Sequence, residues 1–405
     1  MRDIDEAIDK YKSYGSDAQQ SGPTEPISKR MKDSYVEGYL PFTTDPVVRE
    51  DYINAFGGIR LGKLLEDLDA LSGAIAYKHC DDLNHRTLPL AIVTASVDRI
   101  DLLNSLEIDR DMRLSGHVTY VGSSSMEITV RVESSIKEGE VRDDEDGGMI
   151  PIMLARFTFV ARDPTTDKAA RVNTLALTTH LEHEIFEAGR RAKEQASIAR
   201  RTDLSRQAPT AAESAAIHQT WSSNYGLDDL DIRPKPGSIS PRQTQLGRAL
   251  LCHPAQRNLR NNVFGGYLMK ESYDLAFITA NIHLAHRPRF LSSSQLTFSH
   301  PVPIGSVLDF KARVVAQNET RFCVTVTADT VVPATQDRRT TSTFHYTFSR
   351  TCDENGAGQI CGRELISETY GDAVRQVAAQ RRERGALSRE DQIQLFRRLR
   401  LPAST

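Results

Sequence analysis

The 405-residue chain has few cysteines, no long apolar run and almost no net charge, and each scarcity excludes a class of protein. Five scattered cysteines without a CxxC pair suit a reducing intracellular compartment better than a disulfide framework. No apolar run approaches the roughly 18 residues that a membrane-spanning helix requires. The formal net charge of −3 gives no general attraction to nucleic acid or to an anionic membrane.

Motifs of several enzyme classes are also absent or incomplete. No GxSxG nucleophile elbow occurs, which argues against an α/β-hydrolase triad. Residues 57–63 match the GxxxxGK start of a phosphate loop, but Leu64 stands where magnesium coordination needs Ser or Thr. Residues 79–85 contain His, Cys and Asp at a spacing that fits no standard zinc site, so His79 and its counterpart His283 are expected to be helix-end residues. We expect no metal and no cofactor.

What the chain does contain is a long internal repeat. Residues 62–79 and 266–283 each begin with Gly, end with His and enclose a nearly apolar segment with helical spacing. A repeat of this length indicates two copies of one domain. Alternating segments typical of antiparallel strands follow both copies. The sequence therefore predicts an α+β fold of the tandem (double) hotdog type, in which a curved antiparallel sheet wraps each long central helix.

The domain boundaries follow from changes in composition. The segment 143–148 is acidic and is expected to be an exposed loop, and the C-terminal region is basic and polar and is expected to form a solvated surface helix. The predicted parts are a polar tail or strap at 1–45, hotdog domains at 46–180 and 241–370, a helical connector and linker at 181–240, and a basic helix and tail at 371–405.

The entrance to the second helix is the first candidate site. Two consecutive glycines, Gly265 and Gly266, let backbone approach a ligand closely. Free N–H groups at a helix amino end favour developing negative charge, so the Gly266 N–H could polarise a thioester or ester carbonyl. Asn262 is placed to hydrogen-bond a water or that carbonyl, and Phe264 and Gly265 are candidates for substrate contact. Such a cluster is also an ordinary helix-entry turn.

Two carboxylates inside the apolar helices are candidate general bases. In the aligned repeats Asp69 corresponds to Tyr273, whereas Asp274 corresponds to Ala70. One residue is about 100° of helix rotation, so the two acids cannot point the same way. Either the two helices enter their domains differently, or only one of the two acids acts as the base.

Several motifs in order resemble the acyl-CoA thioesterase family, of the thioesterase 9 type, over roughly residues 50–370. The motifs occupy residues 60–71, 92–101, 115–127, 252–254, 261–270, 301–305 and 344–348. The resemblance implies a double hotdog that hydrolyses fatty acyl-CoA to free fatty acid and coenzyme A. It also implies homo-oligomers, often trimers of double hotdogs, and a mitochondrial location. The acidic start of the chain is no transit peptide, which keeps the cytoplasm as an alternative.

The resemblance also implies a catalytic pair, an Asn before the Gly-Gly of one domain and an acid on the helix of the other. Asn262 fits the first role, whereas Gly58 stands at the matching position of the first domain, so that domain's pseudo-symmetric site is expected to be inactive. The expected site joins Asn262, the Gly266 N–H and Asp69, which acts as general base or, less simply, as nucleophile. Asp274 remains the reserve acid and a candidate for substrate contact.

Two other functions stay open at this point. One is a non-catalytic hotdog that binds or senses acyl-CoA. The other is a hotdog hydratase or dehydratase, which usually needs a His facing the thioester, and neither copy has a His beside Gly-Gly.

Overall fold

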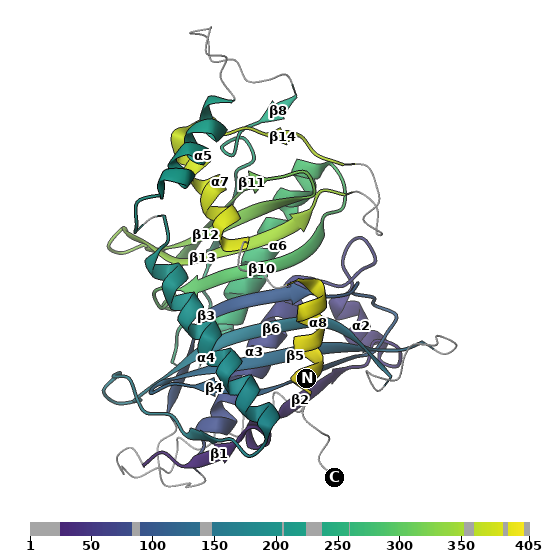
Figure 1. Cartoon of the computed structure of the whole chain (residues 1–405), viewed down its shortest axis with the longest axis vertical. Helices are drawn as coiled ribbons and strands as arrows, with labels where there is room; N and C mark the ends of the chain where they lie inside the picture. Colours follow the sequence, from purple (N-terminus) through teal and green to yellow (C-terminus); the bar gives the residue numbers. More distant parts are fainter. Residues whose placement is uncertain are drawn as a thin grey trace. The chain divides into compact units, whose positions relative to one another are not determined.

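The computed structural model describes residues 25–82, 90–137, 148–204, 206–223, 237–258, 260–351, 360–383 and 388–400. The chain divides into two compact units (Figure 1). Unit 1 draws on residues 1–193, 254–270 and 387–405, and unit 2 on residues 194–253 and 271–386. The segment 254–270 opens the second repeat in sequence, yet it belongs to unit 1. Each unit contains a long helix and an antiparallel sheet, so the predicted double hotdog is confirmed.

Unit 1 is built around α3 (Leu61–Cys80), which confirms the helix expected there. Leu64, Leu68 and Leu71 recur at helical spacing and are completely buried. α3 packs against all five strands of the antiparallel sheet of this unit, and α4 (His180–Arg201) lies on the other face of that sheet (Figure 1). The strand order is β2 (Val36–Leu40), β4 (Met112–Val121), β5 (Ser125–Ser135), β6 (Met149–Arg162) and β3 (Ala91–Leu102).

Unit 2 repeats the plan around α6 (Gly265–Leu284), whose first residues to Lys270 are assigned to unit 1. The side chain of Tyr273 on α6 packs against Phe290 and Tyr346 of the sheet. The strand order is β10 (Arg289–Phe298), β13 (Asp337–Ser349), β12 (Arg321–Val332), β11 (Val307–Gln317) and β9 (Leu246–Leu251). The second helix and the strands predicted to follow it are confirmed, and β9 adds an edge strand that precedes the helix in sequence.

The N-terminal segment is more than the polar tail or strap that the sequence predicted. Its described part contains β1 (Ser28–Arg30), the 3₁₀ helix η1 (Met31–Ser34) and β2, which pairs with β4 as an edge strand. Met31, Leu40 and Phe42 of this segment are buried in the core of unit 1, whereas Tyr39 is exposed. A short helix, α2 (Pro46–Tyr52), then leads to α3.

The single solvated C-terminal helix that the sequence predicted is two packed helices. α7 (Tyr370–Glu383) packs on β11 and on α5 (Ala211–Ser222) in unit 2. α8 (Arg389–Arg398) packs on β6 in unit 1, where Phe396 is buried. The helices are basic on one face only, so composition alone concealed their apolar faces.

Small elements complete the described residues: β7 (Thr174–Ala176), β8 (Ser238–Ile239), β14 (Glu364–Leu365) and the 3₁₀ helix η3 (Pro254–Gln256). Residues 143–147 of the predicted acidic loop and 228–236 of the predicted linker lie outside the described residues. Cys80, Cys252 and Cys323 are free, whereas Cys361 is disulfide-bonded.

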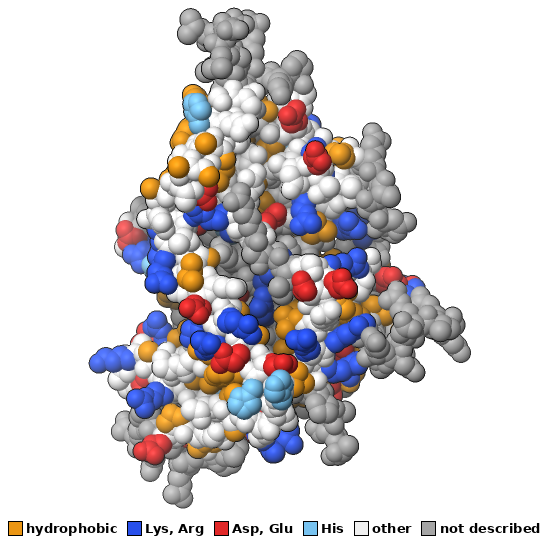
Figure 2. All heavy atoms as spheres, viewed as in Figure 1, with side chains coloured by type: hydrophobic (Ala, Val, Ile, Leu, Met, Phe, Trp, Pro, Cys, Tyr) orange, Lys and Arg blue, Asp and Glu red, His pale blue; other side chains and the backbone are white. Residues whose placement is uncertain are grey.

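Within the described residues, no helix is both long and apolar enough to cross a membrane. Basic and acidic side chains are interspersed on the face drawn in Figure 2, in keeping with the small net charge of −3.

Candidate active site

Asp69 is a carboxyl group in the interior of unit 1. It lies in the middle of α3, has an exposed fraction of 0%, and accepts a hydrogen bond at Oδ1 from Thr94 Oγ1 of β3 at 3.0 Å. Burial raises the pKa of Asp69 to about 7, and the Thr94 hydroxyl and the Gly266 N–H oppose part of that rise. Asp69 Oδ2 has no hydrogen-bond partner within the described part of the chain. The sequence predicted Asp69 but not Thr94.

The two glycines at the start of α6 lie directly against this carboxyl group. A Cβ atom at Gly265 would lie 3.2 Å from Asp69 Oδ2 and 3.4 Å from Thr94 Oγ1. A Cβ atom at Gly266 would lie 2.9 Å from the Glu66 carbonyl oxygen, 3.1 Å from Asp69 Cβ and 2.6 Å from the ring of Phe264. The glycines therefore serve a close approach of α6 to α3, and this approach brings Gly265 and Gly266 together with Asp69.

Asn262 and Phe264 lie in the loop just before these glycines, and both side chains are half-buried. Asn262 Nδ2 donates to the Arg260 carbonyl at 3.3 Å, a contact within its own loop. The loop is organised by Asn258, whose Oδ1 accepts from the backbone N–H groups of Arg260 at 2.9 Å and of Asn262 at 3.2 Å. Asn258 is a residue that the sequence interpretation missed.

The loop before α3 has the same hydrogen bonds. Asn54 Oδ1 accepts from the backbone N–H groups of Phe56 at 2.9 Å and Gly58 at 3.0 Å, as Asn258 does in the second repeat. Each loop has a left-handed residue at the same place, Gly57 with φ +75° in the first and Asn261 with φ +59° in the second. The alignment that pairs Gly62 with Gly266 also pairs Asn54 with Asn258, and that signal could have identified the repeated asparagine.

The reserve acid, Asp274, lies on α6. It belongs to the part of α6 in unit 2 and is half-buried. The residue aligned with Asp69 is Tyr273, which is 5% exposed and packs edge-on against Phe290 and Tyr346, with ring centroids 5.6 and 5.5 Å away. Unit 2 therefore has an aromatic cluster where unit 1 has a carboxyl group.

The two helix-end histidines make hydrogen bonds inside their units. His79 Nε2 lies 2.9 Å from the Asn173 carbonyl, and His283 Nε2 lies 2.8 Å from Gln317 Oε1. Burial lowers the pKa of both histidines, so they are neutral partners at helix ends rather than cations. His85 lies outside the described residues, which contain no group of three or more His, Cys, Asp or Glu side chains able to hold a metal ion.

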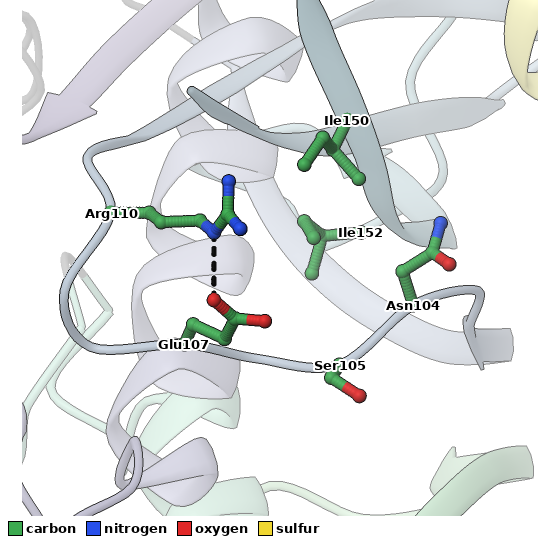
Figure 3. Close-up of a pocket in the computed structure, with 6 residues that line it drawn as sticks. All are labelled: Asn104, Ser105, Glu107, Arg110, Ile150 and Ile152. Carbon is green, nitrogen blue, oxygen red and sulfur yellow. Dashed lines mark hydrogen bonds and ion pairs between the residues drawn. The ribbon is translucent and has the colours of Figure 1, made fainter. Parts of the chain in front are cut away.

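A separate small hollow of about 130 Å³ is present in unit 1. In Figure 3 the side chains of Arg110 and Glu107 face each other, and Arg110 Nε lies 2.7 Å from Glu107 Oε2. The lining consists of Asn104, Ser105, Glu107, Arg110, Ile150 and Ile152 and does not include Asp69 or the glycines. Because its two charges neutralise each other, this hollow adds no group to the candidate site.

Several known proteins are similar in sequence to this chain. Residues 44–138 match the thioesterase superfamily. Acyl-coenzyme A thioesterase 9, mitochondrial, of Homo sapiens is 33% identical over 324 residues, which are 79% of this chain and 72% of that protein. Acyl-coenzyme A thioesterase 2, chloroplastic, of Humulus lupulus is 34% identical over 331 residues, 80% of this chain and 74% of that protein. The solved structure of an apo-hexameric acyl-CoA thioesterase is 27% identical, with a TM-score of 0.33, and covers 42% of this chain and 94% of its own. The chain belongs to the acyl-CoA thioesterase family.

Proposed function

We propose that this chain hydrolyses the thioester of fatty acyl-CoA to free fatty acid and coenzyme A, with Asp69 as the general base. The observation that carries the proposal is a fully buried carboxyl group beside the Gly-Gly entrance of α6, with its pKa raised to about 7. A base with a pKa near the working pH combines a large ionised fraction with strong basicity.

The reaction follows from the placement of these groups. Asp69 Oδ2, which has no donor within the described residues, takes a proton from a water molecule as its oxygen attacks the thioester carbonyl carbon. The negative charge that develops on the carbonyl oxygen is stabilised by the Gly266 N–H at the amino end of α6. The intermediate then breaks its carbon–sulfur bond, and the leaving thiolate takes the proton from Asp69.

Asn262 and Phe264 have supporting roles in this proposal. The Asn262 side chain turns from the Arg260 carbonyl to hold the water or the thioester, and Phe264, Gly265 and Asp274 contact the substrate. The alternative route, attack by Asp69 itself, forms a mixed anhydride that water then hydrolyses. Single turnover in ¹⁸O-water separates the two, because only the anhydride route can leave label in the Asp69 carboxyl group.

The proposal is tested by thiol release from acyl-CoA substrates of increasing chain length. We expect turnover by the wild-type chain and its loss in Asp69→Asn and Asn262→Ala while both variants stay folded. Near wild-type rates in both variants would refute the assignment of the site. Tight binding of unhydrolysed acyl-CoA would identify a binding or sensing protein, and water addition to enoyl-CoA would identify a hydratase.

Three further properties are proposed on the basis of family membership. The reaction needs no cofactor, so dialysis against a chelator should leave the rate unchanged. The chain forms a homo-oligomer, a trimer of double hotdogs, which light scattering would measure. The location is mitochondrial, with the cytoplasm as the alternative, because the similar human protein is named mitochondrial; imaging of the tagged full-length protein would decide.

A further inference from the structure

A cluster of cationic side chains lies in unit 1 beside the loop that leads into α6. The segments 162–171 and 257–260 contain five Lys or Arg residues and two Asp residues. At the centre of the cluster, Asp167 pairs with two arginines from different segments. Arg260 Nη2 lies 2.5 Å from Asp167 Oδ1, and Arg162 Nη1 lies 3.0 Å from Asp167 Oδ2. We call Arg162, Asp167 and Arg260 the arginine pair site.

The turn that carries Asp167 is held in a defined conformation. Asp163 Oδ1 accepts from the backbone N–H groups of Thr165 at 2.9 Å and Thr166 at 2.7 Å, and the Asp167 N–H donates to the Asp163 carbonyl at 3.0 Å. Asp167 has a φ of +56°. The turn therefore fixes an acidic residue whose side chain orients two guanidinium groups.

The arginines remain accessible although they are paired. The exposed fraction of the side chain is 24% for Arg260 and 44% for Arg162. Two guanidinium groups at a surface suit a phosphate group, because the planar fork of Arg bonds phosphate oxygens in pairs.

The position of Arg260 links this cluster to the candidate active site. Arg260 lies in the loop organised by Asn258, five residues before Gly265. This loop leads directly to Gly265, where a Cβ atom would lie 3.2 Å from Asp69 Oδ2. Five residues of extended chain span at most about 18 Å, so Arg260 lies within that distance of Gly265.

We propose that Arg162 and Arg260 bind the phosphate groups of the coenzyme A portion of the substrate. This inference rests on the proposed thioester hydrolysis at Asp69. A substrate with its thioester at Asp69 and Gly266 has phosphates at the far end of the long pantetheine arm, and Arg260 marks a cationic edge at a distance that such an arm can span. Asp167 holds the two arginines ready, which reduces the side-chain entropy lost on binding.

The test compares two substrates with the same acyl group, acyl-CoA and acyl-pantetheine, which lacks every phosphate. Arg260→Gln and Arg162→Gln should each raise KM for acyl-CoA about tenfold or more, since each removes a charge-assisted contact. KM for acyl-pantetheine and kcat for both substrates should stay the same. Added salt should weaken acyl-CoA binding in the wild type and less so in the variants. Acyl-3′-dephospho-CoA shows which phosphate is bound.

Arg190→Gln is the matched control, because Arg190 is an exposed arginine of unit 1 that pairs with Glu187 on α4 at 2.6 Å. It should leave KM unchanged for both substrates. Equal effects of Arg260→Gln on acyl-CoA and acyl-pantetheine, or no effect on either, would refute phosphate binding. If the wild type hydrolyses neither substrate, the proposed function itself fails. This result differs from an equal change of KM for both substrates in the variants, which refutes phosphate binding alone.

Discussion

The two repeats use the same position of the central helix in opposite ways. In unit 1 the position holds Asp69, a buried carboxyl group that accepts a hydrogen bond from Thr94. In unit 2 it holds Tyr273, which packs among the rings of Phe290 and Tyr346. One copy keeps a group that is costly to bury, and the other copy fills the same place with apolar surface.

The loops that lead into the two helices have not diverged in the same way. Asn54 and Asn258 accept equivalent pairs of backbone hydrogen bonds in the two copies. The loop geometry is therefore a structural property of the repeat, whereas a carboxyl group at the Asp69 position belongs to one copy only. This contrast agrees with the role proposed for Asp69, because both copies have the loop and only one has the carboxyl group at this position.

The largest expected effect comes from removing that acid. Asp69→Asn should reduce kcat/KM for acyl-CoA by about a hundredfold or more, because a general base contributes at least that factor. In the wild type, the rate should rise with pH through about 7 as Asp69 loses its proton. Initial rates between pH 5 and pH 9 measure both effects. If Asp69→Asn keeps full activity and Asp274→Asn loses it, the base is the reserve acid, Asp274, and not Asp69.

The same substitution should stabilise the folded chain at high pH. The pKa of Asp69 is raised from its ordinary 3.8 to about 7 in the folded state, so the folded protein loses stability as the pH rises between these values. Above pH 7, ionisation of Asp69 lowers the free energy of unfolding by at most about 4 kcal/mol. Denaturant unfolding should show Asp69→Asn to be more stable than wild type at pH 8 and equal to it near pH 4. Lower stability of the variant at pH 8 would contradict the raised pKa.

The matching position in unit 2 should give the opposite result. Tyr273→Ala removes a buried ring from an aromatic cluster and should lower the free energy of unfolding by about 3–5 kcal/mol, without the pH dependence seen at Asp69. Tyr273→Phe, which keeps the ring, is the control and should be nearly neutral. Denaturant unfolding at pH 5 and pH 8 measures both variants. A cost below about 1 kcal/mol for Tyr273→Ala would mean that the cluster does not stabilise unit 2.

Much of this organisation could be predicted from the sequence, because it depends on local patterns. The spacing of Leu64, Leu68 and Leu71 specifies a buried helix, and the repeat specifies a second one. Thr94 could not be predicted, because its contact with Asp69 depends on how β3 packs on α3. The packing of α8 through Phe396 was concealed for a related reason, since a short basic helix shows its buried face only against its partner strand.

The next prediction tests the feature that the repeats share. Asn54→Ala and Asn258→Ala should each cost about 1–2 kcal/mol of stability, since each removes the acceptor of two backbone hydrogen bonds in a loop. Only Asn258→Ala should also reduce acyl-CoA turnover, because its loop carries Asn262 and leads to Gly266. Thermal unfolding and thiol release measure the two effects separately. Equal losses of activity in both variants would contradict the prediction that only the Asn258 loop supports acyl-CoA turnover.

The smallest expected effect concerns the hydroxyl group that contacts the acid. The Thr94 hydroxyl donates to Asp69 Oδ1 and so favours the charged carboxylate. Thr94→Val removes this donor, so the pKa of Asp69 should rise further above 7. The rate at pH 7 should fall about tenfold or less, and most of the loss should be recovered at pH 9, because the carboxylate is then ionised. Thr94→Ser keeps a hydroxyl group and should retain the wild-type pH profile. If Thr94→Val lowers the rate equally at every pH, Thr94 positions Asp69 without tuning its ionisation, and the difference between the two repeats depends on burial of the acid alone.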